Sequence, residues 1–135
     1  ITGSRAEYGL LRPVIRDIQK SPSLSLRLLV TGMHTLKKHG STIHEVKREF
    51  PVHKTVTVEE NDTMLESLAK EIRGIETYVR KERPDVILVL GDRDEALAGA
   101  LVGQFRVRQL SSASLQTSAL VLAPAMFAIA WWLAF

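Results

Sequence analysis

The stretch Arg-Pro-Asp-Val-Ile-Leu-Val-Leu-Gly-Asp-Arg-Asp-Glu-Ala-Leu-Ala, residues 83–98, decides the fold class. Its aliphatic run at 85–90 is typical of a strand that is buried on both faces of a sheet. Gly91 marks the corner where this strand gives way to a polar loop. The spacing of Ala96, Leu97, Ala100 and Leu101 then predicts the inner face of a helix. A strand, a polar loop and a helix in this order are typical of a parallel α/β sheet.

The residues before this stretch repeat the alternation of helices and strands. Apolar positions three and four residues apart predict helices, and short apolar runs between turn residues predict strands. The expected elements are a helix at 8–20, a strand at 24–31, a short helix ending near Arg48, a strand at 52–58 and a long helix capped by Asn61 or Asp62 and ending before Pro84. Residues 1–3 are expected to be the end of a truncated first strand, which is central in a doubly wound sheet. We therefore expect an α/β fold with a doubly wound parallel sheet.

Composition divides the chain of 135 residues into two parts. Charged residues are frequent up to Arg108, and residues 109–135 carry none. We therefore expect one incomplete α/β domain at 1–105 and an uncharged apolar tail at 106–135. A net charge of +3 with dispersed basic residues argues against nucleic-acid binding, and the absence of cysteine excludes disulfides and fits a cytoplasmic location.

Neither a metal site nor a cofactor site is expected from the sequence patterns. His39, His44 and His53 lack the spacing of metal ligands with each other or with carboxylates. The glycine patterns of dinucleotide-binding and P-loop proteins are also absent from the sequence.

Polar clusters follow three of the expected strands, at residues 2–8, 31–34 and 91–95. Ligands of parallel sheets bind beyond the carboxyl ends of the strands. Arg5 precedes a helix N-terminus that can bind a phosphate, and Asp92 can act as a base that Arg93 keeps ionised. The simpler interpretations are that Asp92 caps a helix and that His34 is a hydrogen-bonding loop residue. We expect the loops bearing Arg5, His34 and Asp92 to gather along one rim.

Three blocks of sequence, at residues 1–13, 30–34 and 83–98, resemble the hydrolysing UDP-N-acetylglucosamine 2-epimerases in the order of that family. The resemblance covers about residues 1–105. It implies the N-terminal, Rossmann-like half of a glycosyltransferase-B-type fold that acts on a UDP-sugar. The implied reaction is anti elimination of UDP through a 2-acetamidoglucal, followed by addition of water to give N-acetylmannosamine. The product feeds sialic acid or related synthesis, no cofactor is implied, and family members are commonly homo-oligomeric.

The resemblance also assigns roles to single residues. It implies that Asp92 is catalytic and that Arg5, His34 and Arg93 bind the substrate. After the helix that follows residues 91–93, the family pattern of a His-rich, Gly-Gly-Glu-bearing loop and a second domain is not found. We therefore expect this chain alone to be an inactive fragment. A sugar transferase of the same architecture and a non-catalytic, membrane-anchored remnant are the alternatives.

The tail at 119–135 contains seventeen uncharged residues and is expected to be helical. A shifted reading frame would explain its composition and the lost family pattern together. A membrane contact is the second interpretation. Seventeen residues are close to the length of about 20 apolar residues that a membrane span needs. The third is a helix that covers the sheet.

Overall fold

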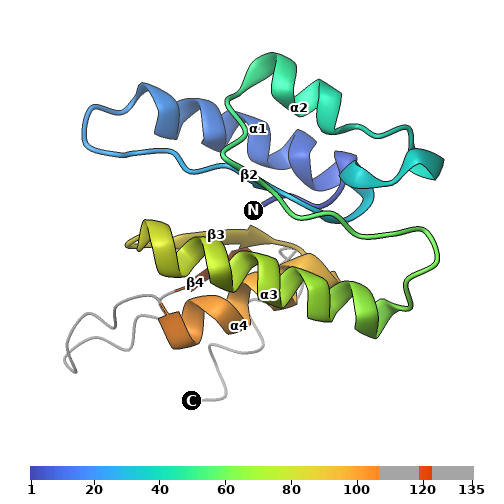
Figure 1. Ribbon diagram of the computed structural model, residues 1–135. Helices are drawn as coiled ribbons and strands as arrows, with labels where there is room; N and C mark the ends of the chain where they lie inside the picture. The colour runs from blue at the N-terminus through green and yellow to red at the C-terminus, as the bar shows by residue number, and fades with distance from the viewer. Residues whose placement is uncertain (107–118, 123–135) are drawn as a thin grey trace, which may run out of the picture.

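The computed structural model describes residues 1–106 and 119–122, and these residues form three layers, with strands between two pairs of helices (Figure 1). Helices α1 and α2 cover one side of the strands, and helices α3 and α4 cover the other. The elements in chain order are α1 (Arg5–Lys20), β1 (Leu29–Val30), the 3-10 helices η1 (Gly32–Thr35) and η2 (Lys37–His39), α2 (Ile43–Glu49), β2 (Lys54–Thr55), α3 (Met64–Glu82), β3 (Ile87–Leu90), α4 (Asp94–Arg106) and β4 (Ala119–Leu122).

All of the strand pairings within the described residues are parallel. Strand β1 pairs with β2, and β3 pairs with β4. The N-terminal segment connects the two pairs, because Thr2 bridges to Val30 and the amino group of Ile1 donates to the carbonyl of Leu88 at 2.9 Å. The described strands therefore form two two-stranded sheets, and residues 1–2 lie between them. The predicted α/β class with parallel strands is confirmed.

Alternation along the strands explains why helices cover both faces. Leu28 and Val30 pack in the cluster of α1 and α2, whereas Leu29 between them packs in the cluster of α3 and α4. Strand β3 alternates in the same way, with Ile87 and Val89 facing α3 and α4. Successive side chains of a strand point to opposite faces, so an uninterrupted aliphatic run needs an apolar layer on each side.

Several predicted boundaries are wrong. The strands expected at 24–31 and 52–58 are only two residues long in each case, at Leu29–Val30 and Lys54–Thr55. Helix α3 begins after Thr63 rather than after Asn61 or Asp62. The reason is a capping box, in which the Thr63 side chain accepts from the Glu66 amide while the Glu66 carboxylate accepts from the Thr63 amide.

The tail prediction is wrong for residues 119–122, which form strand β4 rather than a helix. They pair in parallel with all four residues of β3, so this short apolar run satisfies the free backbone edge of that strand. The remainder of the predicted tail lies outside the described residues. Within the described part of the chain, no helix combines the length and the apolar character that a membrane crossing requires.

The buried face of α3 can be tested with Ile75, whose side chain is fully buried in the cluster under β1 and β3. We expect Ile75→Ala to lower the free energy of unfolding by about 2–5 kcal/mol, because truncation leaves a cavity in a packed core. The matched control is Leu65→Ala on the same helix, because Leu65 is exposed and should change stability by less than about 0.5 kcal/mol. Urea denaturation followed by circular dichroism measures both, and equal effects of the two changes would contradict the described packing.

Candidate active site

The three predicted loops meet at the carboxyl edge of the parallel strands. The His34 amide donates to the Gly3 carbonyl at 3.1 Å, which joins the first loop to the second. A Cβ atom on Gly3 would lie 2.0 Å from Glu95 Oε1, and one on Gly91 would lie 3.1 Å from Glu7 Oε1. The first loop is therefore packed against the loop after β3 at two points. A side chain at position 3 would force the Glu95 side chain to move, which favours glycine there.

The start of α1 is fixed by a second capping box. The Ser4 hydroxyl accepts from the Glu7 amide, and the Glu7 carboxylate accepts from the amides of Gly3 and Ser4 at 3.1 and 3.2 Å. Arg5 follows as the first helical residue, and its side chain is 73% exposed. Its guanidinium pairs with Glu45 of α2 at 3.1 Å. The helix N-terminus and an exposed arginine thus lie together, as the sequence predicts.

His34 is fully buried beneath these loops. Its Nε2 lies 3.3 Å from the Thr2 hydroxyl, and its Nδ1 lies 2.7 Å from the Thr42 hydroxyl. The edge of the Tyr8 ring also packs on the imidazole, with the ring centroids 6.1 Å apart. Burial lowers the pKa of His34, although Ser4 and Glu45 act in the opposite direction. The neutral imidazole therefore links the first strand to the segment before α2.

Asp92 and Arg93 lie at the start of α4, next to a cavity of about 280 Å³ that is lined by Gly91, Asp92, Arg93, Ala96, Leu97 and Ala100. Gly91 has a φ of 93°, which a residue with a side chain rarely adopts. This turn leaves Asp92 exposed to solvent. Within the described residues, no hydrogen bond or ion pair joins Arg5, His34 and Asp92 to one another. The structure therefore gathers their loops but not their side chains.

Within the described part of the chain, Arg93 pairs with Glu95 and Asp94 and not with Asp92. The Arg93 Nε donates to Glu95 Oε1 at 2.9 Å, and a terminal nitrogen lies 3.7 Å from an Asp94 oxygen. Glu95 is almost completely buried, and a buried carboxylate without a partner is costly. Pairing of Arg93 with Glu95 is therefore favoured over pairing with the exposed Asp92.

A cluster of carboxylates below Asp92 was not predicted. One carboxylate oxygen each from Glu71, Asp94 and Glu95 lies within 4.8 Å of the others. Burial raises the pKa of Glu71 to about 7, although the Thr31 hydroxyl, which donates to Glu71 Oε1 at 2.9 Å, opposes the rise. Burial and the neighbouring Asp94 raise the pKa of Glu95 to about 8. The sequence contained one signal, since Glu71 lies on the apolar face of its helix, between Leu68 and Ile75. The prediction of no metal site rested on histidine spacing and did not consider these residues.

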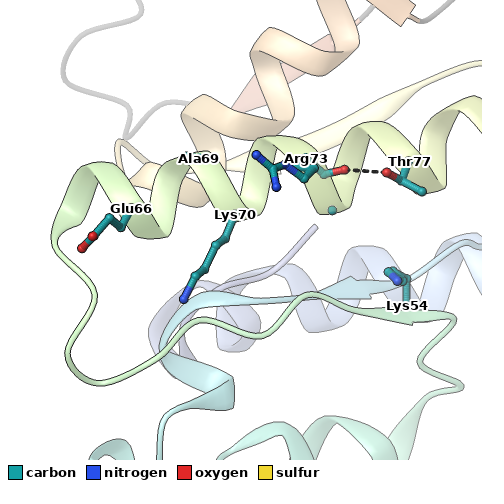
Figure 2. Close-up of a pocket in the computed structure, with 7 residues that line it drawn as sticks. Lys54, Glu66, Ala69, Lys70, Arg73 and Thr77 are labelled. Carbon is teal, nitrogen blue, oxygen red and sulfur yellow. Dashed lines mark hydrogen bonds between the residues drawn. The ribbon is translucent and has the colours of Figure 1, made fainter.

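A larger cavity of about 550 Å³ lies beside α3 and β2, away from the three loops (Figure 2). Lys70 extends away from α3 in this view. Its amino group donates to both oxygens of Asp62, at 2.7 and 2.8 Å. The lining residues are Lys54, Glu66, Ala69, Lys70, Arg73, Gly74 and Thr77. Because none of them belongs to a strand-end loop, we place the candidate site at the carboxyl edge instead.

The comparison with known proteins agrees with the three sequence blocks. The sequence model of the UDP-N-acetylglucosamine 2-epimerase family matches residues 16–108, which is more than half of the chain. The chain belongs to this family. A UDP-N-acetylglucosamine 2-epimerase from Neisseria meningitidis is 40% identical over 110 residues, which cover 80% of this chain and 29% of that protein. A hydrolysing UDP-N,N'-diacetylbacillosamine 2-epimerase from Legionella pneumophila is 36% identical over 106 residues, which cover 75% of this chain and 28% of that protein.

Two solved structures have a fold similar to that of this chain. A structure from Listeria monocytogenes has a TM-score of 0.66 at 21% identity, over 77% of this chain and 27% of that protein. A crystal structure of a UDP-N-acetylglucosamine 2-epimerase has a TM-score of 0.63 at 20% identity, over 76% and 27% of the two chains. The chain thus spans between a quarter and a third of the length of these relatives.

The buried His34 should make stability depend on pH. Because its pKa is lower in the folded chain than the usual 6.5, the unfolded chain binds a proton more readily as the pH falls below that value. Stability associated with His34 is therefore present above pH 6.5 and is lost as the pH falls towards the folded pKa. Denaturation of the wild type and of His34→Gln at several pH values should show a smaller acid loss in the variant.

Glu71 and Glu95 have raised pKa values, which change stability in the opposite direction over the same pH range. Their contributions cancel when the stability of His34→Gln is subtracted from that of the wild type at each pH. His39→Gln, at an exposed position, controls for the loss of an imidazole. An identical acid loss in the wild type and in His34→Gln would contradict a destabilising protonation of the buried ring.

Proposed function

We propose that the chain forms the N-terminal side of the active site of a hydrolysing UDP-N-acetylglucosamine 2-epimerase, which converts UDP-N-acetylglucosamine and water into N-acetylmannosamine and UDP. The observation that carries this proposal is the convergence of three loops at one sheet edge in a member of this family. The relatives from Neisseria and Legionella carry epimerase names, and the Legionella name specifies a hydrolysing enzyme. A cytoplasmic location stays a prediction from the absence of cysteine, and a homo-oligomeric state stays a prediction from the resemblance.

The strand order supports a doubly wound sheet, the N-terminal half of a glycosyltransferase-B-type fold. From residues 1–2 at the centre, the chain adds β1 and β2 on one side and then β3 and β4 on the other. Ligands of such sheets bind where the order reverses, in the crevice outside the carboxyl ends of the strands. Here that point lies between residues 1–2 and β3. The loops that follow these two strands carry Arg5 and Asp92.

The environment of each side chain suggests its role. Asp92 is exposed beside a cavity and can exchange the proton at C2 of the sugar. Arg5 is paired only at the surface, and such a pair is weak enough to be replaced by a diphosphate that also meets the free amides of α1. Arg93 is 41% exposed and can present its remaining donors to the leaving group. His34 has both nitrogens engaged, so we assign it to holding the loops that contact the substrate.

A chimaera tests this assignment. We would insert residues 1–105 in place of the matching segment of the Neisseria relative and measure release of N-acetylmannosamine and UDP. The chimaera should be active, and Asp92→Asn should lower kcat by about 10²- to 10⁴-fold because it removes a proton-transfer group. Arg5→Ala should raise KM more than it lowers kcat if the guanidinium binds the diphosphate equally in the ground and transition states.

Asp85→Asn is the matched control, because Asp85 is an exposed aspartate just before the opposite end of the same strand, β3. It should leave kcat within about twofold of the parent chimaera, as a surface change away from the site. Full activity of Asp92→Asn would overturn the catalytic role. Transfer of the sugar to an acceptor without free N-acetylmannosamine would instead identify a transferase.

A further inference from the structure

We propose that Glu71, Asp94 and Glu95 form a binding site for one hard divalent cation of the size of calcium. The three residues come from two helices, because Glu71 lies in the middle of α3 and the other two form the first turn of α4. The site therefore lies directly below the loop that carries Asp92. A bound ion would connect this loop to α3 through bonds that the protein groups alone do not make.

The spacing of the carboxylates fits one shared ion. One oxygen from each of the three residues lies within 4.8 Å of the other two. Calcium binds oxygen at 2.3–2.6 Å, so two ligands on opposite sides of the ion lie about 4.6–5.2 Å apart. All three oxygens can therefore reach a common centre with small side-chain adjustments. Magnesium requires bonds near 2.0–2.1 Å and octahedral geometry, which would demand a tighter arrangement.

An unsatisfied oxygen gives independent evidence for a ligand. Glu71 is fully buried, and its Oε1 accepts from the Thr31 hydroxyl, but its Oε2 has no hydrogen-bond partner among the described residues. Glu95 is 2% exposed, and its Oε2 is also without a hydrogen bond in the described part of the chain. Buried polar atoms in native proteins are almost always paired, so each exception requires an explanation. A cation bound between the two side chains supplies the missing partner for both.

When all three carboxylates are ionised, the charges of the cluster fit the same kind of partner. Three ionised carboxylates and the single guanidinium of Arg93, which pairs with Glu95 and Asp94, carry a net charge of −2. Such a charge is strongly disfavoured away from water. One divalent cation makes the cluster neutral, and carboxylate oxygens select calcium, magnesium or manganese over softer metals.

Calcium binding to the isolated chain tests the proposal. After dialysis against EDTA and then against metal-free buffer, the chain should bind CaCl₂ with one saturable site in calorimetry, and its Tm should rise with the calcium concentration. Glu71→Gln retains the shape and the acceptor for Thr31 but removes a charged ligand. We expect it to weaken binding by on the order of tenfold or more and to abolish the rise in Tm. The control is Glu59→Gln, because Glu59 is 75% exposed and lies outside the cluster.

A second measurement uses the unmodified chain, so it does not depend on the folding of a variant. Paramagnetic MnCl₂ should first broaden the amide NMR signals of Thr31, Gly32, Glu71, Asp94 and Glu95. Broadening confined to another acidic region, such as residues 59–62, would overturn the proposal. An unchanged Tm in excess calcium, or wild-type affinity in a folded Glu71→Gln variant, would also overturn it and leave protons as the neutralising partner.

Discussion

The hydrogen bonds of residues 1–3 are the constraint on which the rest of the structure depends. Thr2 donates to the Leu29 carbonyl and accepts from the Thr31 amide, while Ile1 reaches the Leu88 carbonyl on the other side. This short segment therefore joins the β1–β2 pair to the β3–β4 pair. The carbonyl of Gly3 accepts a hydrogen bond from the His34 amide, and the missing side chain of Gly3 leaves space for Glu95. The central strand position thus determines both the packing of the sheet and the meeting of the three loops.

Local patterns predicted much of the fold. The helices α1, α3 and α4 and the strand β3 have long periodic or continuous apolar runs, and all four are found at the predicted places. The strands β1 and β2 are shorter than predicted because an extended apolar segment counts as a strand only where a partner pairs with it. The fate of residues 119–122 could not be decided locally, because a short apolar run fits a buried helix as well as a strand. Residues 119–122 form a strand because they pair with the free edge of β3.

Some features of the candidate site were likewise predictable from the sequence, and others were not. Glycines at strand ends predicted the positions of the loops. The Ser4–Glu7 capping box, which starts α1 at Arg5 instead of the expected residue 8, was not predicted, although its spacing is local. The partners of the buried side chains were not visible. Thr31 and Glu71 are 40 residues apart, and Thr2 and His34 are 32 apart, so only the folded sheet brings them together. Arg93 has acidic neighbours on both sides, and burial rather than spacing selected Glu95 over Asp92.

The buried carboxylates also bear on the proposed binding of a sugar nucleotide at this edge. A diphosphate is an anion, and an uncompensated charge of −2 in Glu71, Asp94, Glu95 and Arg93 would repel it through a medium that screens poorly. Burial, and to a smaller extent the neighbouring Asp94, raises the pKa values of Glu71 and Glu95, so the ionised cluster is disfavoured in the folded chain. Neutralisation of the cluster, by a cation or by protons, is therefore a condition for anion binding at the adjacent loops. It also leaves Arg5 and the amides at the start of α1 as the dominant positive groups, which is the arrangement that a leaving diphosphate requires.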